Sequence, residues 1–130
     1  MTITNYRVDV LTDAGGAATA YSNMPVNGKL LHMRYIPDGT SPLDTGADIT
    51  VTGESSGIAI VTKANIGTSA FTLAPRQPTH NASDGSAALY AAAGTAVNAK
   101  IALAGERIKV VVAQGGNALK GQFQFVVDDD

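Results

Sequence analysis

The sequence predicts an all-β protein, an antiparallel β-sandwich or barrel with one long irregular loop. Apolar and polar residues alternate with a period of two in at least six segments, and no segment of comparable length shows helical periodicity. Gly-rich turns separate these short segments at regular spacing. The chain has 130 residues and no Cys, so we expect a single β domain over residues 1–130, stabilised by one ordinary core.

The N-terminal segment illustrates the alternation. In residues 6–10, three apolar side chains alternate with Arg7 and Asp9, as expected for a half-buried strand. A Gly-Gly break at residues 15 and 16 follows, and then a short β-prone run. Asn27-Gly28 lies between β-prone runs and predicts a two-residue hairpin turn.

Residues 30–36 predict a strand with two different faces. His32 and Arg34 share one face, which is either solvated or a subunit contact, because Arg is enriched at interfaces. The opposite face is predicted to point into the core and carries Leu31, Met33 and Tyr35.

The remaining strands are predicted from "DITVTG" (48–53), "GIAIVTK" (57–63), "KIALAG" (100–105), "RIKVVVAQ" (107–114) and "LKGQFQFVV" (119–127). The alternation along the chain also predicts which side chains are buried. The predicted core consists of Val8, Val10, Leu31, Met33, Ile49, Val51, Ile58, Ile60, Ile108, Val110, Val112, Phe123 and Phe125.

Residues 76–98 interrupt the strand pattern and form the predicted long loop. A structureless stretch of this length is uncommon in a compact domain and is usually functional or mobile. Its Ala cluster at 87–93 could form one helical turn. Leu89 and Tyr90 either fold back onto the core or dock on a partner. The candidate interface residues of this segment are Arg76, His80, Leu89 and Tyr90.

"GESSG" at residues 53–57 matches the G-x-S-x-G pattern of serine hydrolases. That motif requires a strand, a strained turn and then a helix, whereas the following "IAIVT" favours a strand. The histidines that could serve as a base are His32 and His80, which lie in a predicted strand and in the long loop. We therefore expect Ser55 to lie in a hairpin loop and the protein not to be an enzyme.

Other residue patterns give no cofactor or metal site. Asp38, Asp44 and Asp48 do not have EF-hand spacing, and they are better explained as turn and strand-start residues. "GGNALKG" (115–121) lacks the order of a phosphate-binding loop. We expect no cofactor.

Charge and hydropathy limit the partners. Apart from a predicted acidic tail at residues 128–130, the chain carries nine basic and eight acidic side chains, which argues against nucleic-acid binding. The N-terminus lacks the pattern of a signal peptide, and no apolar run is long enough for a membrane helix. We expect neither nucleic acid nor a membrane as partner.

Three stretches of the chain carry a family resemblance. These are "DITVTGESSGIAIVTKANIGTS" (48–69), "PR" (75–76) and "ERIKVVVAQGGNALKGQFQF" (106–125). With them the sequence resembles small virion proteins of tailed bacteriophages. The resemblance implies a mostly β fold and a structural role as a minor capsid or decoration protein. It also implies assembly in the host cytoplasm, a place on the capsid, and binding to the major capsid protein and to further copies of itself as a homo-oligomer.

Other functions remain open from the sequence. A head–tail connector or tail component would differ from a shell protein in copy number per particle. A carbohydrate-binding or adhesive β-sandwich would need exposed aromatic residues, yet the chain has no Trp and four Tyr. A hydrolase would need a base near Ser55.

Overall fold

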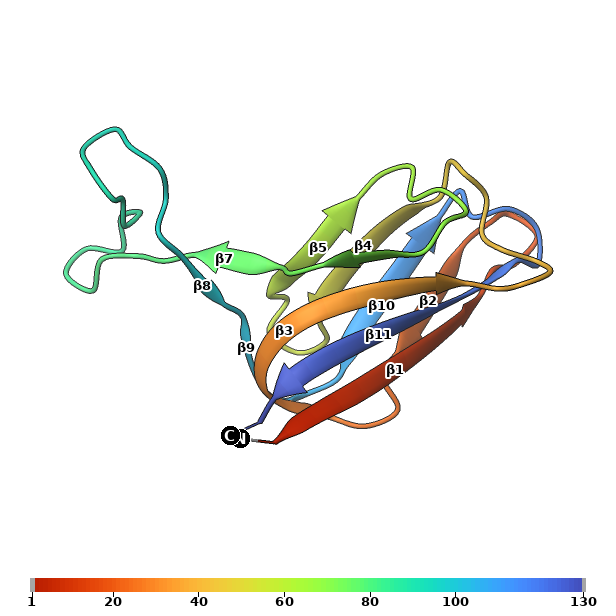
Figure 1. Cartoon of the computed structure of the whole chain (residues 1–130), viewed down its shortest axis with the longest axis horizontal. Helices are drawn as coiled ribbons and strands as arrows, with labels where there is room; N and C mark the ends of the chain where they lie inside the picture. Colours follow the sequence, from red (N-terminus) through yellow and green to blue (C-terminus); the bar gives the residue numbers. More distant parts are fainter. Residues whose placement is uncertain (1, 130) are drawn as a thin grey trace.

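The computed structural model describes residues 2–129, which form two antiparallel sheets packed face to face with a two-stranded arm projecting to one side (Figure 1). No helix occurs among these residues, and hence none that could span a membrane. The all-β fold class predicted from the alternating pattern is confirmed.

The first sheet is built around the long strand β3. Its order is β1-β11-β3-β6, and β9 also pairs with β3, on the edge that it shares with β6. Every strand pair in this sheet is antiparallel. The strands are β1 (Ile3–Leu11), β11 (Lys120–Asp128), β3 (Val26–Pro37), β6 (Phe71–Leu73) and β9 (Ala102–Glu106).

The second sheet covers the inner face of the first. Its order is β2-β10-β4-β5, again entirely antiparallel. A separate two-stranded sheet forms the base of the arm. The second sheet contains β2 (Ala18–Tyr21), β10 (Ile108–Ala113), β4 (Asp48–Gly53) and β5 (Ala59–Lys63), and the arm contains β7 (Arg76–Pro78) and β8 (Asn98–Lys100).

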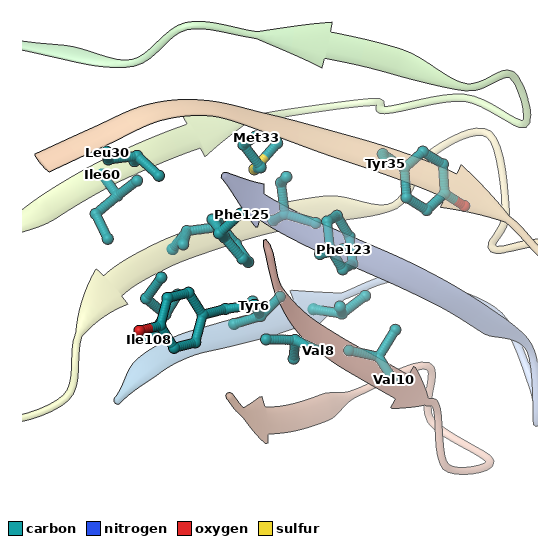
Figure 2. Packing of buried hydrophobic residues seen from close by; sticks show 14 of the residues in the cluster. Tyr6, Val8, Val10, Leu30, Met33, Tyr35, Ile60, Ile108, Phe123 and Phe125 are labelled. Atoms are coloured by element: carbon teal, nitrogen blue, oxygen red, sulfur yellow. The ribbon is translucent and has the colours of Figure 1, made fainter. Parts of the chain in front are cut away.

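The core lies between the two sheets, where side chains from alternate positions of each strand interdigitate (Figure 2). The rings of Tyr35 and Phe123 stack with their centroids 5.0 Å apart, and Phe71 lies 5.4 Å from Tyr35 on the other side. Eleven of the thirteen predicted core residues are buried, which confirms the period-two interpretation for most strands.

The two exceptions are Leu31 and Ile58, which are only half-buried. A β-bulge in β3 explains Leu31. Val126 pairs with His32 but Val127 pairs with Leu30, so Leu31 is an extra residue without a cross-strand partner. The bulge shifts the alternation, and Leu30 instead of Leu31 enters the core.

The predicted hairpin turn at Asn27-Gly28 is wrong. Both residues lie inside β3, where Gly28 has a φ of 127° and a Cβ atom would meet the backbone of Asp128. The chain turns earlier, at residues 22–25, where the Ser22 hydroxyl donates to the Met24 carbonyl at 2.9 Å. Gly28 is therefore required for a close backbone approach rather than for a turn.

The acidic C-terminus is partly incorporated into the sheet. Asp128 is the last residue of β11, and the Asp129 amide donates to the Thr2 carbonyl at 3.0 Å. Asp130 lies outside the described residues. At least these two acidic residues therefore belong to the folded body.

Candidate functional site

The arm comprises residues 76–100 and leaves the body through a break in one edge strand. Leu73 at the end of β6 pairs with Met33, and the Leu30 amide donates to the Ile101 carbonyl at 2.8 Å. Strands β6 and β9 therefore continue one another along β3, and the arm is inserted between them opposite the bulge at Leu31. The arm therefore interrupts what would otherwise be one edge strand of the first sheet.

Arg76 secures the base of the arm to the body. Its Nη1 atom donates to the Leu31 carbonyl at 3.2 Å and to the Pro75 carbonyl at 2.8 Å. Leu31 lies at the bulge of β3, opposite the gap between β6 and β9. The structure thus places Arg76 at the base of the arm, in contact with the backbone of β3.

The arm is stiffened by backbone hydrogen bonds at a three-way junction. The Thr79 amide donates to Val97 at 2.8 Å, the Ala88 amide to Thr79 at 3.0 Å, and the Val97 amide to Ala88 at 2.9 Å. Two small loops leave this junction, residues 80–87 and residues 89–96 (Figure 1). The predicted long loop is therefore an extended structure with paired backbone groups.

The first loop begins at His80, which forms an isolated β-bridge with Ala87. Asp84 closes the tip by accepting hydrogen bonds from the Ser86 amide at 3.0 Å and the Ser86 hydroxyl at 2.7 Å. These bonds lower the pKa of the Asp84 carboxyl below its usual value. The loop thus satisfies its own polar groups without help from the body.

The second loop carries the two large apolar side chains of the arm. Leu89 forms a β-bridge with Ala96, and Tyr90 donates its amide to the Thr95 carbonyl at 3.0 Å. Residues 90–93 turn instead of forming the helical turn considered for the Ala cluster, and Ala93 has a φ of 56°. Leu89 is 41% exposed and Tyr90 is 75% exposed, so neither caps the core.

The composition of the arm is unusual for an exposed segment. The fifteen residues from 85 to 99 contain no charged side chain, and all but Ala88, Ala96 and Val97 are exposed. Exposed surfaces of soluble proteins are normally rich in charge, whereas charged residues are depleted in the centres of interfaces. The arm therefore has the composition of a contact surface rather than of a solvated loop.

His32 and Arg34 lie elsewhere, on the outer face of the first sheet. That face is polar and internally paired. Asn5 donates to Gln124 at 3.2 Å, Gln124 to Gln122 at 2.7 Å and Gln122 to Asp9 at 3.3 Å. A shallow hollow of about 310 Å³ at its end is lined among others by Arg7, Asp9, Asp38 and Lys120. Solvent suits this face better than an apolar partner.

"GESSG" forms the turn of the β4–β5 hairpin, as predicted for Ser55. The turn encloses the carboxylate of Glu106, whose Oε1 atom accepts from the Ser55 amide at 3.0 Å, the Ser56 amide at 3.0 Å and the Ser56 hydroxyl at 3.1 Å. These hydrogen bonds lower the pKa of Glu106. A Cβ atom at Gly53 would collide with the same carboxylate, which explains the first glycine of the motif.

Glu54 in the same turn holds Arg107 at the start of β10. Two hydrogen bonds join its carboxylate to the guanidinium, with 2.8 Å between Nε and Oε1. They lower the pKa of Glu54 and raise that of Arg107. Sequence reasoning missed Glu54, Glu106 and Arg107, because this pairing depends on how distant strands are brought together.

Within residues 2–129, no group of three or more His, Asp or Glu side chains is placed to hold a metal ion. No family model matches the chain, and no curated protein matches its sequence. A crystal structure of FlhE can be aligned with 98% of this chain and 96% of its own, with a TM-score of 0.43 and 16% identity. That TM-score is too low to support an argument about function.

Proposed function

We propose that this protein is a structural subunit that works by assembly, and that the arm provides one of its contacts. The observation that carries the proposal is the insertion of an exposed arm, uncharged over residues 85–99, into an edge strand that would otherwise be continuous. The arm adds almost nothing to the core of its own body, because its side chains lie outside the core cluster. Its role is therefore to be sought outside the body.

The chemistry of the arm fits a protein partner. Tyr and other large side chains at well-supported positions contribute most of the binding energy in protein interfaces. Tyr90 and Leu89 are exposed on a loop whose backbone is already hydrogen-bonded, so docking them would order few additional groups. Small Ala and Gly residues around them permit close backbone approach.

The resemblance of the sequence to virion proteins supports the surface of a bacteriophage head as the setting. In that setting the protein would be a minor capsid or decoration protein that binds the major capsid protein and neighbouring copies of itself. A shell presents many equivalent sites, so a weak contact from each copy would be strengthened by avidity.

The proposal can be tested by trimming the arm. Pro78 pairs with Asn98, so replacing residues 79–97 with Asn-Gly should close β7 and β8 with a two-residue hairpin turn. We expect the trimmed protein to keep its β-rich circular dichroism spectrum and cooperative unfolding. Its oligomerisation in sedimentation velocity and its attachment to purified heads should fall sharply.

A matched pair of point variants separates the arm from general surface hydrophobicity. Tyr90→Ser should weaken assembly, whereas Ile3→Ser, which removes another half-exposed apolar side chain from β1, should not. Trimmed protein that assembles and attaches as well as the intact chain would refute the proposal.

A further inference from the structure

We infer that the arm of one copy docks on the edge strand β2 of a second copy, in a head-to-tail contact. This inference rests on the proposed role of the arm in assembly and adds the identity of its partner surface. It follows from the state of the β2 edge, the distribution of charge, a pre-positioned tyrosine, and the placement of arm and edge in the fold.

Strand β2 is an open edge of the second sheet. Among residues 2–129 it pairs with β10 alone, and its other side ends the sheet. Natural proteins protect such edges with charged side chains. Arg7 and Asp9 lie on edge strand β1, and Lys63 lies on edge strand β5 and over the Phe71 ring of β6. β2, with the sequence ATAY, has no such charge. An edge without charge can accept an added strand from another chain, here over the four residues of β2.

The β2 edge and the arm share a property that makes them compatible. Residues 14–28, which include β2 and its flanks, form a run of fifteen without a charged side chain, and the arm contains the second run of that length at residues 85–99. Neither run has a charged side chain of its own, and Arg107 beside Tyr21 is already paired with Glu54, so contact between the runs avoids the large desolvation cost of an unpaired ion. Each charged edge elsewhere on the body would incur that cost against residues 85–99 of the arm.

Tyr21 at the end of β2 is a positioned anchor on this edge. The guanidinium of Arg107 lies 4.3 Å from the centre of its ring, and Glu54 holds that guanidinium through two hydrogen bonds. Tyr21 is nevertheless 36% exposed, and Met24 in the following turn is 54% exposed. A rigid, exposed aromatic side chain beside a flexible methionine is suited to a binding hot spot. The "GESSG" turn supports this anchor through Glu54.

The positions of donor and acceptor require two molecules. The arm leaves from the β6 and β9 edge of the first sheet, whereas β2 lies beside β1, at the opposite edge (Figure 1). The arm points away from the body and therefore from its own β2. A contact between two different surfaces is heterologous, so repeated docking generates a closed ring or an open filament.

The edge can be blocked by one charge, with a matched control in the same sheet. Thr19 on β2 and Thr62 on β5 are both exposed residues of edge strands, one at each side of the second sheet. Thr19→Lys should weaken self-association, because docking would bury an unpaired ammonium group. The dissociation constant should rise about tenfold or more. Thr62→Lys should leave it unchanged. Sedimentation equilibrium measures both, and circular dichroism verifies the folds.

Cysteine cross-linking tests the same contact independently. The chain has no Cys, so single-cysteine variants can be mixed in pairs. Ala91→Cys, next to Tyr90, mixed with Asn23→Cys, next to Met24, should give a disulfide-linked heterodimer on mild oxidation, well above the yield of Ala91→Cys mixed with Thr62→Cys. Equal yields from the two mixtures would overturn β2 as the acceptor.

The outcomes separate this inference from the proposed function. If arm trimming dissociates the assembly but Thr19→Lys and Thr62→Lys behave alike, the arm works in assembly and the acceptor assignment is wrong. If the isolated protein is monomeric and gives no preferential cross-link, a second copy is not the partner, and attachment of intact but not trimmed protein to heads would still support the proposed function. If trimming changes neither assembly nor attachment, both fail.

Discussion

The two-sheet body and the projecting arm bury their side chains to very different extents. In the body, alternate positions of β1, β4, β10 and β11 are buried, and Phe123 and Phe125 are completely buried. In the arm, no residue from 76 to 100 is classed as buried. Both regions nevertheless have well-paired backbones. The difference teaches that the body is held by packing, whereas the arm is held by local hydrogen bonds and lacks a core of its own.

The largest effect should come from the centre of the body. Phe125→Ala removes a fully buried ring from between the two sheets and should lower the free energy of unfolding by about 3–5 kcal/mol. Urea unfolding measures this change. A loss below about 1 kcal/mol would show that the core does not depend on this side chain.

The success of the sequence prediction follows the same division. Strands with strict alternation, such as residues 6–10 and 121–127, were assigned to the correct faces because only one register buries their apolar side chains. At positions 30 and 31 either leucine could face the core, so the sequence contains no signal for the bulge that buries Leu30. At Asn27-Gly28 the local turn signal is overridden by strand pairing, since a Cβ atom at Gly28 would collide with the backbone of Asp128 in the neighbouring strand β11.

The candidate site was predictable only in part. The position of the arm could be located because residues 76–98 lack a strand pattern. Its three-way junction could not, because it consists of backbone hydrogen bonds that place no demand on residue type. The Glu106 contact with the "GESSG" turn joins residues about fifty positions apart, so the local sequence does not predict it.

An intermediate effect is expected at the β4–β5 turn, where one carboxylate organises a loop of the body. Glu106→Gln keeps one acceptor oxygen but removes the charge that strengthens three hydrogen bonds, and should cost about 1.5–3 kcal/mol. Thermal unfolding measures the loss. Glu54→Gln, on the exposed side of the same turn, is the matched control and should cost less. Equal losses would contradict a special role for Glu106.

The same turn should make the body sensitive to acid. The folded-state pKa of Glu106 is lowered, chiefly by the Ser56 amide, so its contribution is fully present above the unfolded pKa of about 4.3. It is lost as the pH falls through the lower folded value. Unfolding free energy should therefore decline below about pH 4.3, and less steeply in Glu106→Gln than in the wild type. Parallel pH profiles would contradict this assignment.

The smallest effect on stability should come from the arm. Leu89→Ala alters a side chain that is 41% exposed and outside the core, so the unfolding free energy should change by no more than about 0.5 kcal/mol.

Hydrogen exchange compares the stability of the arm and the body directly. The amides of Thr79, Ala88 and Val97 are bonded only within the arm, so they should exchange through local opening, well before the amides of β11. Raising the protein concentration should slow exchange at these arm amides if they are covered by a neighbouring molecule, while β11 stays unchanged. The contrary result would be that, in the dissociated protein, arm amides exchange as slowly as those of β11. The arm would then open only when the body unfolds, which would contradict the difference in stability between the two regions.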